Sequence, residues 1–229
     1  MNVVDDAWSY LQDGSNWSGA DGIWHLLLQQ LLLTATALAL AALIGLPIAL
    51  WLGHLGRGGV LAINISNVGR AVPTFAVLVL LSVGPAGTAV LGPYGRSGLA
   101  TLIALTLFAL PPIITNAYVA MREVPTEVIE SARGMGMTGA QSFRGVELPL
   151  AGPLIVAGLR LALVQVWATA TIAALVAGPG LGRIITDGFY HSNYGQGVAG
   201  AVVVAVVALV LEVGAALVQR RTVEAVGAR

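Results

Sequence analysis

Long apolar runs, separated by short polar segments, make up most of the chain. A helix needs about 20 apolar residues to cross the hydrocarbon core of a bilayer. Five runs reach this length, the second with polar residues in its first half: 25–52, 60–83, 98–121, 153–176 and 198–218. They are continuous rather than short and alternating, so a membrane barrel is not favoured. The pattern predicts an all-α integral membrane protein with five transmembrane helices.

Composition supports this class. Of the 229 residues, 57% are hydrophobic and 10% are charged, whereas soluble domains carry roughly 25% charged residues. The formal net charge is +0, so no polyanionic partner such as nucleic acid is implied. The lack of cysteine excludes a disulfide framework, a thiolate metal site and a cysteine nucleophile.

Arginine placement predicts the orientation. All 11 basic residues are arginine. With five spans, seven arginines fall on the side of the C-terminus and two, Arg96 and Arg183, on the other side. Cytoplasmic segments of membrane proteins are enriched in basic residues. The N-terminus is therefore expected outside, and the C-terminus, with a tail at 222–229, in the cytoplasm.

Residues 1–24 precede the first span and contain four aspartates but no basic residue. A secretory signal starts with basic residues, so we do not expect this segment to be one. Trp8, Trp17 and Trp24 favour a place at the outer membrane interface, and a mobile tail with a few aromatic residues accounts for them equally well. We expect an extracytoplasmic or interfacial segment at 1–24.

Residues 122–152, between the third and fourth spans, are polar and rich in glycine. Pro125 suits the first turn of a helix, and the glycines of GMGMTG are expected to break that helix. A second short helix is expected to end at Leu148 and Pro149. An amphipathic cytoplasmic hairpin of this kind can be a docking site for a soluble partner or an ordinary connecting loop, and its composition leaves both open.

The residue spacing in this hairpin resembles the signature of binding-protein-dependent ABC importer permeases. That signature has Glu-Ala-Ala, Gly, Ile and Leu-Pro at set intervals, and every interval is kept here, with serine for the first alanine and valine for isoleucine. The resemblance implies a type I ABC importer permease fold over 25–221. It also implies a cytoplasmic coupling-helix hairpin at about 122–152 that sits in a groove of a separate ATPase. The residues assigned to coupling are Glu130, Ser131, Ala132, Arg133, Gly136, Val146, Leu148 and Pro149.

A nucleotide site on this chain is not expected. Gly134, Gly136 and Gly139 fit a dinucleotide-binding pattern, but that pattern has meaning only between a buried strand and a helix. A phosphate-binding loop of the Walker type needs a lysine, and the chain has none. We therefore expect no catalytic residue, metal site or cofactor here, and the resemblance assigns ATP and magnesium to the partner ATPase.

Three further blocks look like the osmoprotectant branch of the family: GRAVPTFAVLVLL (69–81), LPPIITNAYVAMREVPTEVIESARGMGMT (110–138) and TATIAALVAGPGLGRIITDG (169–188). The resemblance implies import of glycine betaine, choline, carnitine or proline betaine. A permease for methionine or another amino acid is the alternative, and a non-transport structural membrane protein is the alternative from a different class. An intramembrane enzyme is not favoured, because the spans hold neither paired Glu and His nor a Ser-Lys dyad.

Several residues are candidates for the pore or its gates. Pro111 and Pro112 lack backbone donors and are expected to kink or break the third span. Broken helices in membranes line cavities or moving parts, and a simple structural kink is the competing interpretation. Trp167 offers an aromatic face to a quaternary ammonium, with packing as the alternative. The candidates are Arg70, Pro73, Pro111, Pro112, Asn116, Trp167, Gly180 and Gly182.

Ionisable residues within spans are costly in lipid. For Arg160 and Glu212 we expect structural pairing rather than transport chemistry. On the outer side, 177–197 is expected to form a tight, exposed polar loop near the external gate. Asp187 and His191 in that loop are too few ligands for a metal site.

The resemblance also implies an assembly in the plasma membrane of a prokaryote. A second permease subunit, identical or homologous, completes the pore. Two ATPase subunits dock on the cytoplasmic side, and a substrate-binding protein docks on the outer side. ATP binding draws the coupling helices together and opens the pore outward, and hydrolysis resets it.

Overall fold

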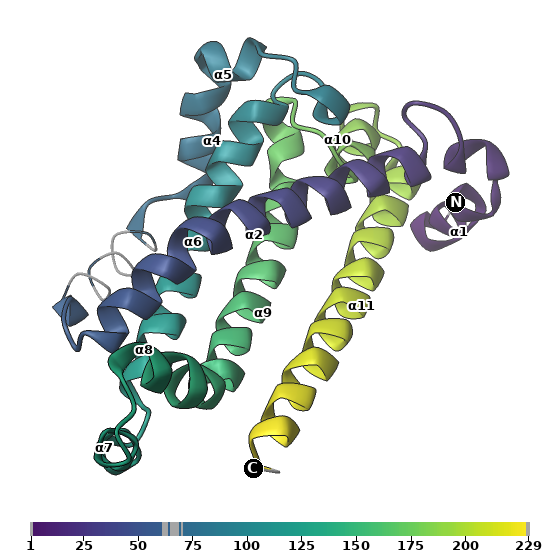
Figure 1. Ribbon diagram of the computed structural model, residues 1–229. Helices are drawn as coiled ribbons and strands as arrows, with labels where there is room; N and C mark the ends of the chain where they lie inside the picture. Colours follow the sequence, from purple (N-terminus) through teal and green to yellow (C-terminus); the bar gives the residue numbers. More distant parts are fainter. Residues whose placement is uncertain (1, 61–63, 65–68, 70, 228–229) are drawn as a thin grey trace. The chain divides into compact units, whose positions relative to one another are not determined.

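The computed structural model describes residues 2–60, 64, 69 and 71–227, without the side chains of 225–227. Every element in this described part is helical (Figure 1). In chain order the elements are α1 (Val3–Gln12), η1 (Gly14–Trp17), α2 (Ile23–His54), α4 (Thr74–Val83), α5 (Pro85–Thr88), η2 (Gly92–Tyr94), α6 (Gly98–Arg122), α7 (Thr126–Gly134), α8 (Gly139–Ser142), the π-helix η3 (Phe143–Glu147), α9 (Leu148–Ile172), η4 (Ala173–Val176), α10 (Gly182–Tyr190) and α11 (Tyr194–Gly227).

Four helical stretches of the described chain are long and apolar enough to cross a membrane. They are α2, α6, the continuous run Gly139–Val176 that contains α9, and α11 up to Glu224. They confirm four of the five expected spans. In the remaining one, 60–83, the structure describes the 10-residue helix α4, and 61–63, 65–68 and 70 lie outside the described residues.

The chain divides into two compact units. Unit 1 comprises 1–38, 72–108 and 164–211, and unit 2 comprises 39–71, 109–163 and 212–229. Four of the five boundaries fall within α2, α6, α9 and α11, and the other lies between residues 71 and 72. Each unit has its own core.

Unit 1 is built around Trp167. This side chain is 1% exposed and packs with Ile23, Leu26, Leu181 and Ile184. Its indole Nε1–H donates to the carbonyl of Val204 at 3.2 Å, which satisfies the polar edge of a buried aromatic ring.

The N-terminal segment is folded onto unit 1 rather than left as a tail. A helix, α1, is followed by the turn η1, and the Trp17 indole donates to the Leu11 carbonyl at 2.8 Å. The helix lies against the start of α11, because a Cβ on Gly195 would come within 2.6 Å of the Asp6 Cβ. A glycine is required at this close approach.

Unit 2 has a core of small residues between α2, α6 and α9. Ala49, Ala117 and Ala120 are buried there with Met121. A Cβ on Gly53 would lie 2.5 Å from the Cβ of Met121. Small side chains let membrane helices approach closely and gain packing contacts that larger side chains would prevent.

The third span was expected to be kinked or broken at its two prolines, and a break is wrong. Helix α6 runs without interruption through Pro111 and Pro112. Membrane helices tolerate proline where neighbouring groups satisfy the freed backbone. The carbonyls that lose a helical donor here are those of Leu107 and Phe108, four residues before the prolines. The bond from the Asn116 Nδ2 to the Pro112 carbonyl, at 2.7 Å, is therefore an additional contact rather than a replacement.

Candidate functional site

The signature begins on α7, a short helix at one end of unit 2 (Figure 1). Glu130, Ser131 and Arg133 are exposed, whereas Ala132 is 1% exposed. The Ser131 hydroxyl donates to the carbonyl of Glu127 within the helix, at 2.7 Å. Thus α7 rests on its alanine and presents polar and charged side chains to the surroundings.

Gly136 forms the C-terminal cap of α7. Its N–H donates to the Arg133 carbonyl at 2.9 Å, and the Met137 N–H donates to the Ala132 carbonyl at 3.1 Å. These two bonds define a Schellman motif, which needs a left-handed residue between them. Gly136 has φ +83°, and a Cβ placed on it would meet no described atom within 4 Å. Backbone conformation, rather than space, therefore explains the glycine.

The second arm of the hairpin begins with a capping box at Thr138. The Thr138 hydroxyl accepts from the Gln141 N–H, and the Gln141 side chain accepts from the Thr138 N–H at 2.7 Å. The spacing T-x-x-Q is a known signal for the start of a helix, so the sequence itself contains the information that places this start.

The prediction that Leu148 and Pro149 end this second helix is wrong. The chain passes from α8 through the π-helix η3 directly into α9, which begins at Leu148. Proline is tolerated in the first turn of a helix, where N–H groups lack helical partners, and a proline next to the η3–α9 junction meets a similar condition. Val146, Leu148 and Pro149 are all half-buried.

A buried carboxylate closes the hairpin. Glu147, the last residue of η3, is held by the ring of His54 at the end of α2 and by the hydroxyl of Ser142. Sequence analysis missed both His54 and Glu147. Because residues 122–152 are polar overall, their sequence gave no reason to expect that the Glu147 side chain is buried.

The turn before α10 in unit 1 is organised by Gln30. This side chain is fully buried on α2. Its Oε1 accepts the Leu181 N–H at 2.8 Å, and its Nε2 donates to the Thr171 hydroxyl at 3.0 Å. Gly180 has φ +109°, and a Cβ there would lie 2.9 Å from the Gln30 Oε1. The glycine thus lets the chain turn against the amide.

The prediction of a polar loop over 177–197 is wrong for most of its length. Helix α10 begins at Gly182, and Gly182, Ile184 and Gly188 are buried. A side chain at Gly182 would meet the Thr171 carbonyl and the Ala174 side chain. Frequent glycines indicated a loop, whereas here they allow close packing of a short helix.

Replacing Gln30 with leucine is expected to destabilise unit 1. Leucine has a similar size but leaves the buried Leu181 N–H unpaired, which costs about 1–3 kcal/mol. This corresponds to a fall of about 3 to 10 °C in the midpoint of thermal unfolding in detergent. Gln12→Leu, at an exposed position of α1, is the control and is expected to unfold at the wild-type midpoint. Equal midpoints for both variants would contradict the role of Gln30.

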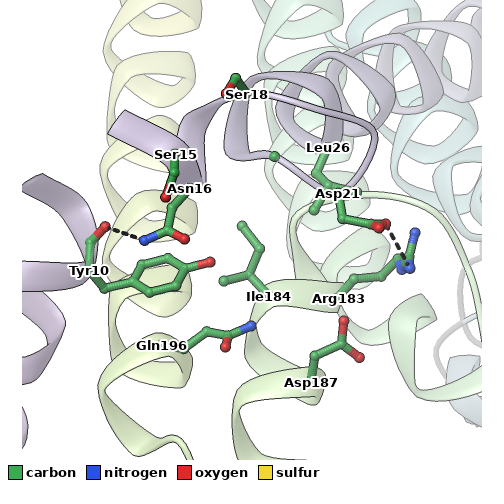
Figure 2. Close-up of a pocket in the computed structure, with 11 residues that line it drawn as sticks. Tyr10, Ser15, Asn16, Ser18, Asp21, Leu26, Arg183, Ile184, Asp187 and Gln196 are labelled. Atoms are coloured by element: carbon green, nitrogen blue, oxygen red, sulfur yellow. Dashed lines mark hydrogen bonds and ion pairs between the residues drawn. The ribbon is translucent and has the colours of Figure 1, made fainter. Parts of the chain in front are cut away.

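A polar pocket of about 460 Å³ lies between the N-terminal segment and α10 in unit 1, and Figure 2 shows its lining side chains. Arg183 pairs with Asp21 at 3.1 Å, and the Asn16 amide donates to the Tyr10 carbonyl at 2.9 Å. Burial raises the pKa of the Tyr10 phenol, and the negative charge of Asp187 adds to the effect. These contacts connect α10 to the N-terminal segment.

Asp187 and His191 do not converge on a common ligand. The His191 Nδ1 lies 2.9 Å from the backbone carbonyl of Asp187. In the part of the chain that the structure describes, no three His, Cys, Asp or Glu side chains form a group that could hold a metal ion.

The remaining pore candidates fall in both units. Trp167, Gly180 and Gly182 belong to unit 1 together with Pro73, which precedes α4 in an extended conformation (ψ 116°). Pro111, Pro112 and Asn116 belong to unit 2. Arg70 lies outside the described residues.

Arg160 and Glu212 pair within unit 2, as expected for structural charges. The Arg160 Nε donates to the Glu212 Oε1 at 2.9 Å, and Nη2 donates to the same oxygen. Its Nη1 donates to the Gln219 Oε1 at 2.9 Å. The Arg160 guanidinium on α9 is thus shared by two acceptors that lie about two turns apart on the same face of α11.

Comparison with known proteins identifies the family. Residues 41–224 match the family described as "Binding-protein-dependent transport system inner membrane component". The choline transport system permease protein OpuBB of Bacillus subtilis is 32% identical over 199 residues, 84% of this chain and 85% of that protein. The glycine betaine/proline betaine transport system permease protein ProW of Escherichia coli is 29% identical over 85% of this chain, which spans about half of ProW (52%).

A solved structure has the same fold. A chain from the inward-facing MetNI methionine ABC transporter superposes with a TM-score of 0.71 and 25% identity, covering 85% of this chain and 93% of that chain. The family match covers most of the sequence and removes the alternative of a non-transport structural protein. The chain belongs to the binding-protein-dependent transport system inner membrane components, and it is the permease subunit of an ABC importer rather than its ATPase.

Proposed function

We propose that this permease subunit imports osmoprotectants such as glycine betaine, choline, carnitine or proline betaine. The substrate class is supported by the similarity to the choline permease OpuBB over 84% of the chain. The energy would come from ATP and magnesium bound by separate ATPase subunits, and this chain would contribute movement rather than catalysis.

The observation that carries the coupling mechanism is the exposed signature helix α7. Its exposed Glu130, Ser131 and Arg133 are available to a partner, while buried Ala132 fixes the helix to unit 2. A short helix held on one face and free on the other can bind in a groove of an ATPase. Movement of the ATPase would then displace the hairpin at about 122–152 as a body and bias the pore between its two states.

The proposed topology has five spans. Residues 60–83 would form the second of them, in addition to the four long helices. Segment 1–24 would be extracytoplasmic or interfacial, 25–221 would form the permease domain, and the tail at 222–229 would be cytoplasmic. The arginine bias supports this orientation. A second permease subunit, identical or homologous, would complete the pore, and a binding protein would dock on the outer side.

The substrate path is proposed to pass the residues singled out in the sequence: Arg70, Pro73, Pro111, Pro112, Asn116, Trp167, Gly180 and Gly182. For Trp167 the buried position in unit 1 supports a packing role, so its contribution to the path would be indirect. Gly180 and Gly182 would act on the external gate through the fixed segment that Gln30 holds.

Calorimetry on the partner binding protein tests the substrate class. We expect one of glycine betaine, choline, carnitine or proline betaine to bind roughly tenfold or more tightly than methionine, a difference of about 1.4 kcal/mol or more. Proline serves as a control that lacks the quaternary ammonium. Tighter binding of methionine would favour the amino acid alternative, for which the fold similarity to the MetNI transporter is the supporting observation.

A further inference from the structure

The end of α2 is tied to the coupling hairpin by one polar cluster within unit 2. The Glu147 side chain is 4% exposed, and its Oε2 lies 2.7 Å from the Nδ1 of His54. Its Oε1 accepts the Ser142 hydroxyl at 3.0 Å. Because a carboxylate accepts hydrogen bonds, Nδ1 carries the proton and donates in either charge state of the imidazole. Both oxygens of Glu147 are therefore occupied, one from α2 and one from the hairpin.

A buried acid is an expensive way to hold two elements together. Removing a carboxylate from water costs free energy that a pair recovers only with good geometry, and well-packed apolar side chains often stabilise a protein as well or better. A hydrogen bond differs from apolar contact in having a fixed direction and length. The benefit of this pair is therefore a defined position rather than stability.

The local backbone is arranged to bring Glu147 to His54. Residues 143–147 form a π-helix, in which the Leu148 N–H bonds to the Phe143 carbonyl five residues earlier. The wider turn changes the direction in which Glu147 points compared with an α-helix. π-Helical turns are rare and occur frequently at functional sites.

Apolar packing around this cluster is incomplete. A cavity of about 420 Å³ adjoins it, lined on the α2 side by Pro47, Leu50 and Trp51 and on the hairpin side by Phe143 and Arg144, among others. Phe143 does contact the His54 ring edge to face, with centroids 5.3 Å apart. Phe143 also packs against the apolar core that contains Ala49 of α2, and beside that contact the hydrogen bond is the polar connection between the two elements.

We propose that the His54–Glu147 hydrogen bond makes the cytoplasmic end of α2 move with the coupling hairpin. His54 and Glu147 are positioning residues: they transmit displacement to the first long helix and take no part in chemistry. The inference rests on the proposed function of the hairpin. Through the link, a shift of α7 and η3 becomes a shift of α2.

The test uses the complete importer in liposomes with its ATPase and binding protein, and measures substrate uptake and ATP hydrolysis together. The double variant His54→Leu, Glu147→Leu replaces the pair with apolar side chains, so that folding and assembly are kept. We expect near-normal ATP hydrolysis and a roughly tenfold fall in substrate taken up per ATP, the size expected for loss of a hydrogen bond to a charged group.

Two single variants separate the bond from the shape of the side chain. The amide nitrogen of asparagine occupies the position of Nδ1, whereas that of glutamine occupies the position of Nε2. His54→Asn is therefore expected to keep most of the uptake per ATP, and His54→Gln is expected to lose it as the double variant does.

Two results would overturn the link. One is an unchanged ratio of uptake to hydrolysis in the double variant, and the other is a proportional loss of assembly, hydrolysis and uptake, which indicates a purely structural pair. The companion variant Glu130→Lys distinguishes the levels. If Glu130→Lys transports normally, the docking role of α7 is wrong. If only the link is wrong, Glu130→Lys is defective while the His54 variants keep the wild-type uptake per ATP.

Discussion

Replacing Gly136 with valine is expected to lower coupled transport roughly tenfold or more. Gly136 has φ +83°, and the left-handed conformation costs an L-residue about 1–2 kcal/mol, more for a β-branched side chain. A cost of about 1.4 kcal/mol shifts a conformational equilibrium tenfold. The cap of α7 would open, and the exposed face of the helix would lose its fixed position. Uptake by the reconstituted importer, compared with its ATP hydrolysis, measures the effect.

Gly134 provides a matched control for this variant. It is the last residue of α7, and a Cβ on it, as on Gly136, would meet no described atom within 4 Å. Gly134 lies in the helix and has no positive φ, so Gly134→Val should retain uptake. Gly136→Asn should also retain much of it, because asparagine tolerates the left-handed region. If Gly136→Val and Gly134→Val transported equally well, the cap would not matter for coupling.

Glu130→Lys tests the exposed face of α7 without changing the cap. Glu130 is exposed, so the folding of this chain should change little. Assembly with the ATPase and the uptake of substrate should both fall if the helix docks as proposed. Normal values for both would contradict docking through this face.

The second large effect is expected at the ion pair of unit 2. Arg160→Leu and Glu212→Leu each leave one charge without its partner within a helix long and apolar enough to cross a membrane, where an unpaired charge is unfavourable. Each is expected to lower the midpoint of thermal unfolding in lipid nanodiscs by about 5 to 10 °C. Insertion into the membrane should fall as well.

The double variant Arg160→Leu, Glu212→Leu distinguishes structure from transport chemistry. Removing both charges removes the penalty, so stability should return to near the wild-type value. Uptake should return with it if the pair is structural. A stable double variant without uptake would instead assign the pair to the transport mechanism. The second acceptor of Arg160, the Gln219 amide, should tolerate the change because it is uncharged.

The spans could be predicted from the sequence because each depends on a local property. A run such as 98–121 or 198–218 is apolar over its whole length, and in lipid every backbone group must be satisfied within the segment. Neither the apolar length nor these backbone hydrogen bonds depend on which neighbouring helix each side chain faces. For the same reason the ends of α2 and α6 were predicted to within about two residues, the usual accuracy of helix boundaries.

The coupling hairpin could be predicted in its first half and not in its second. Pro125, Glu127 and the left-handed Gly136 act within one turn of helix, so their effects are local. The continuation of the helix through Leu148 and Pro149 depends on packing: Leu148 lies against the core formed by Ala151 and Ile155, among others. Burial of that kind outweighs the local preference of a Leu-Pro pair to stop a helix.

Gln30, His54 and Glu147 illustrate what depends on tertiary structure. Their partners are 151 residues away for the bond from the Leu181 N–H to Gln30, and 93 residues away for His54 and Glu147. A single sequence contains no local signal for such pairings. Gln30 could have been noted as a polar side chain within a predicted span, because such a residue needs a partner, but its partner could not have been named.

The sequence of this protein was sufficient to establish its class, its long helices, its signature and thereby its family. Each of these follows from hydropathy, charge or spacing over a short stretch of chain. The tertiary structure decided which glycines serve turns and which serve close packing, which acid is buried, and which residue on α2 faces each loop. Those properties arise from contacts between distant segments, and the free energy of a buried polar group is set by the partner that it finds there.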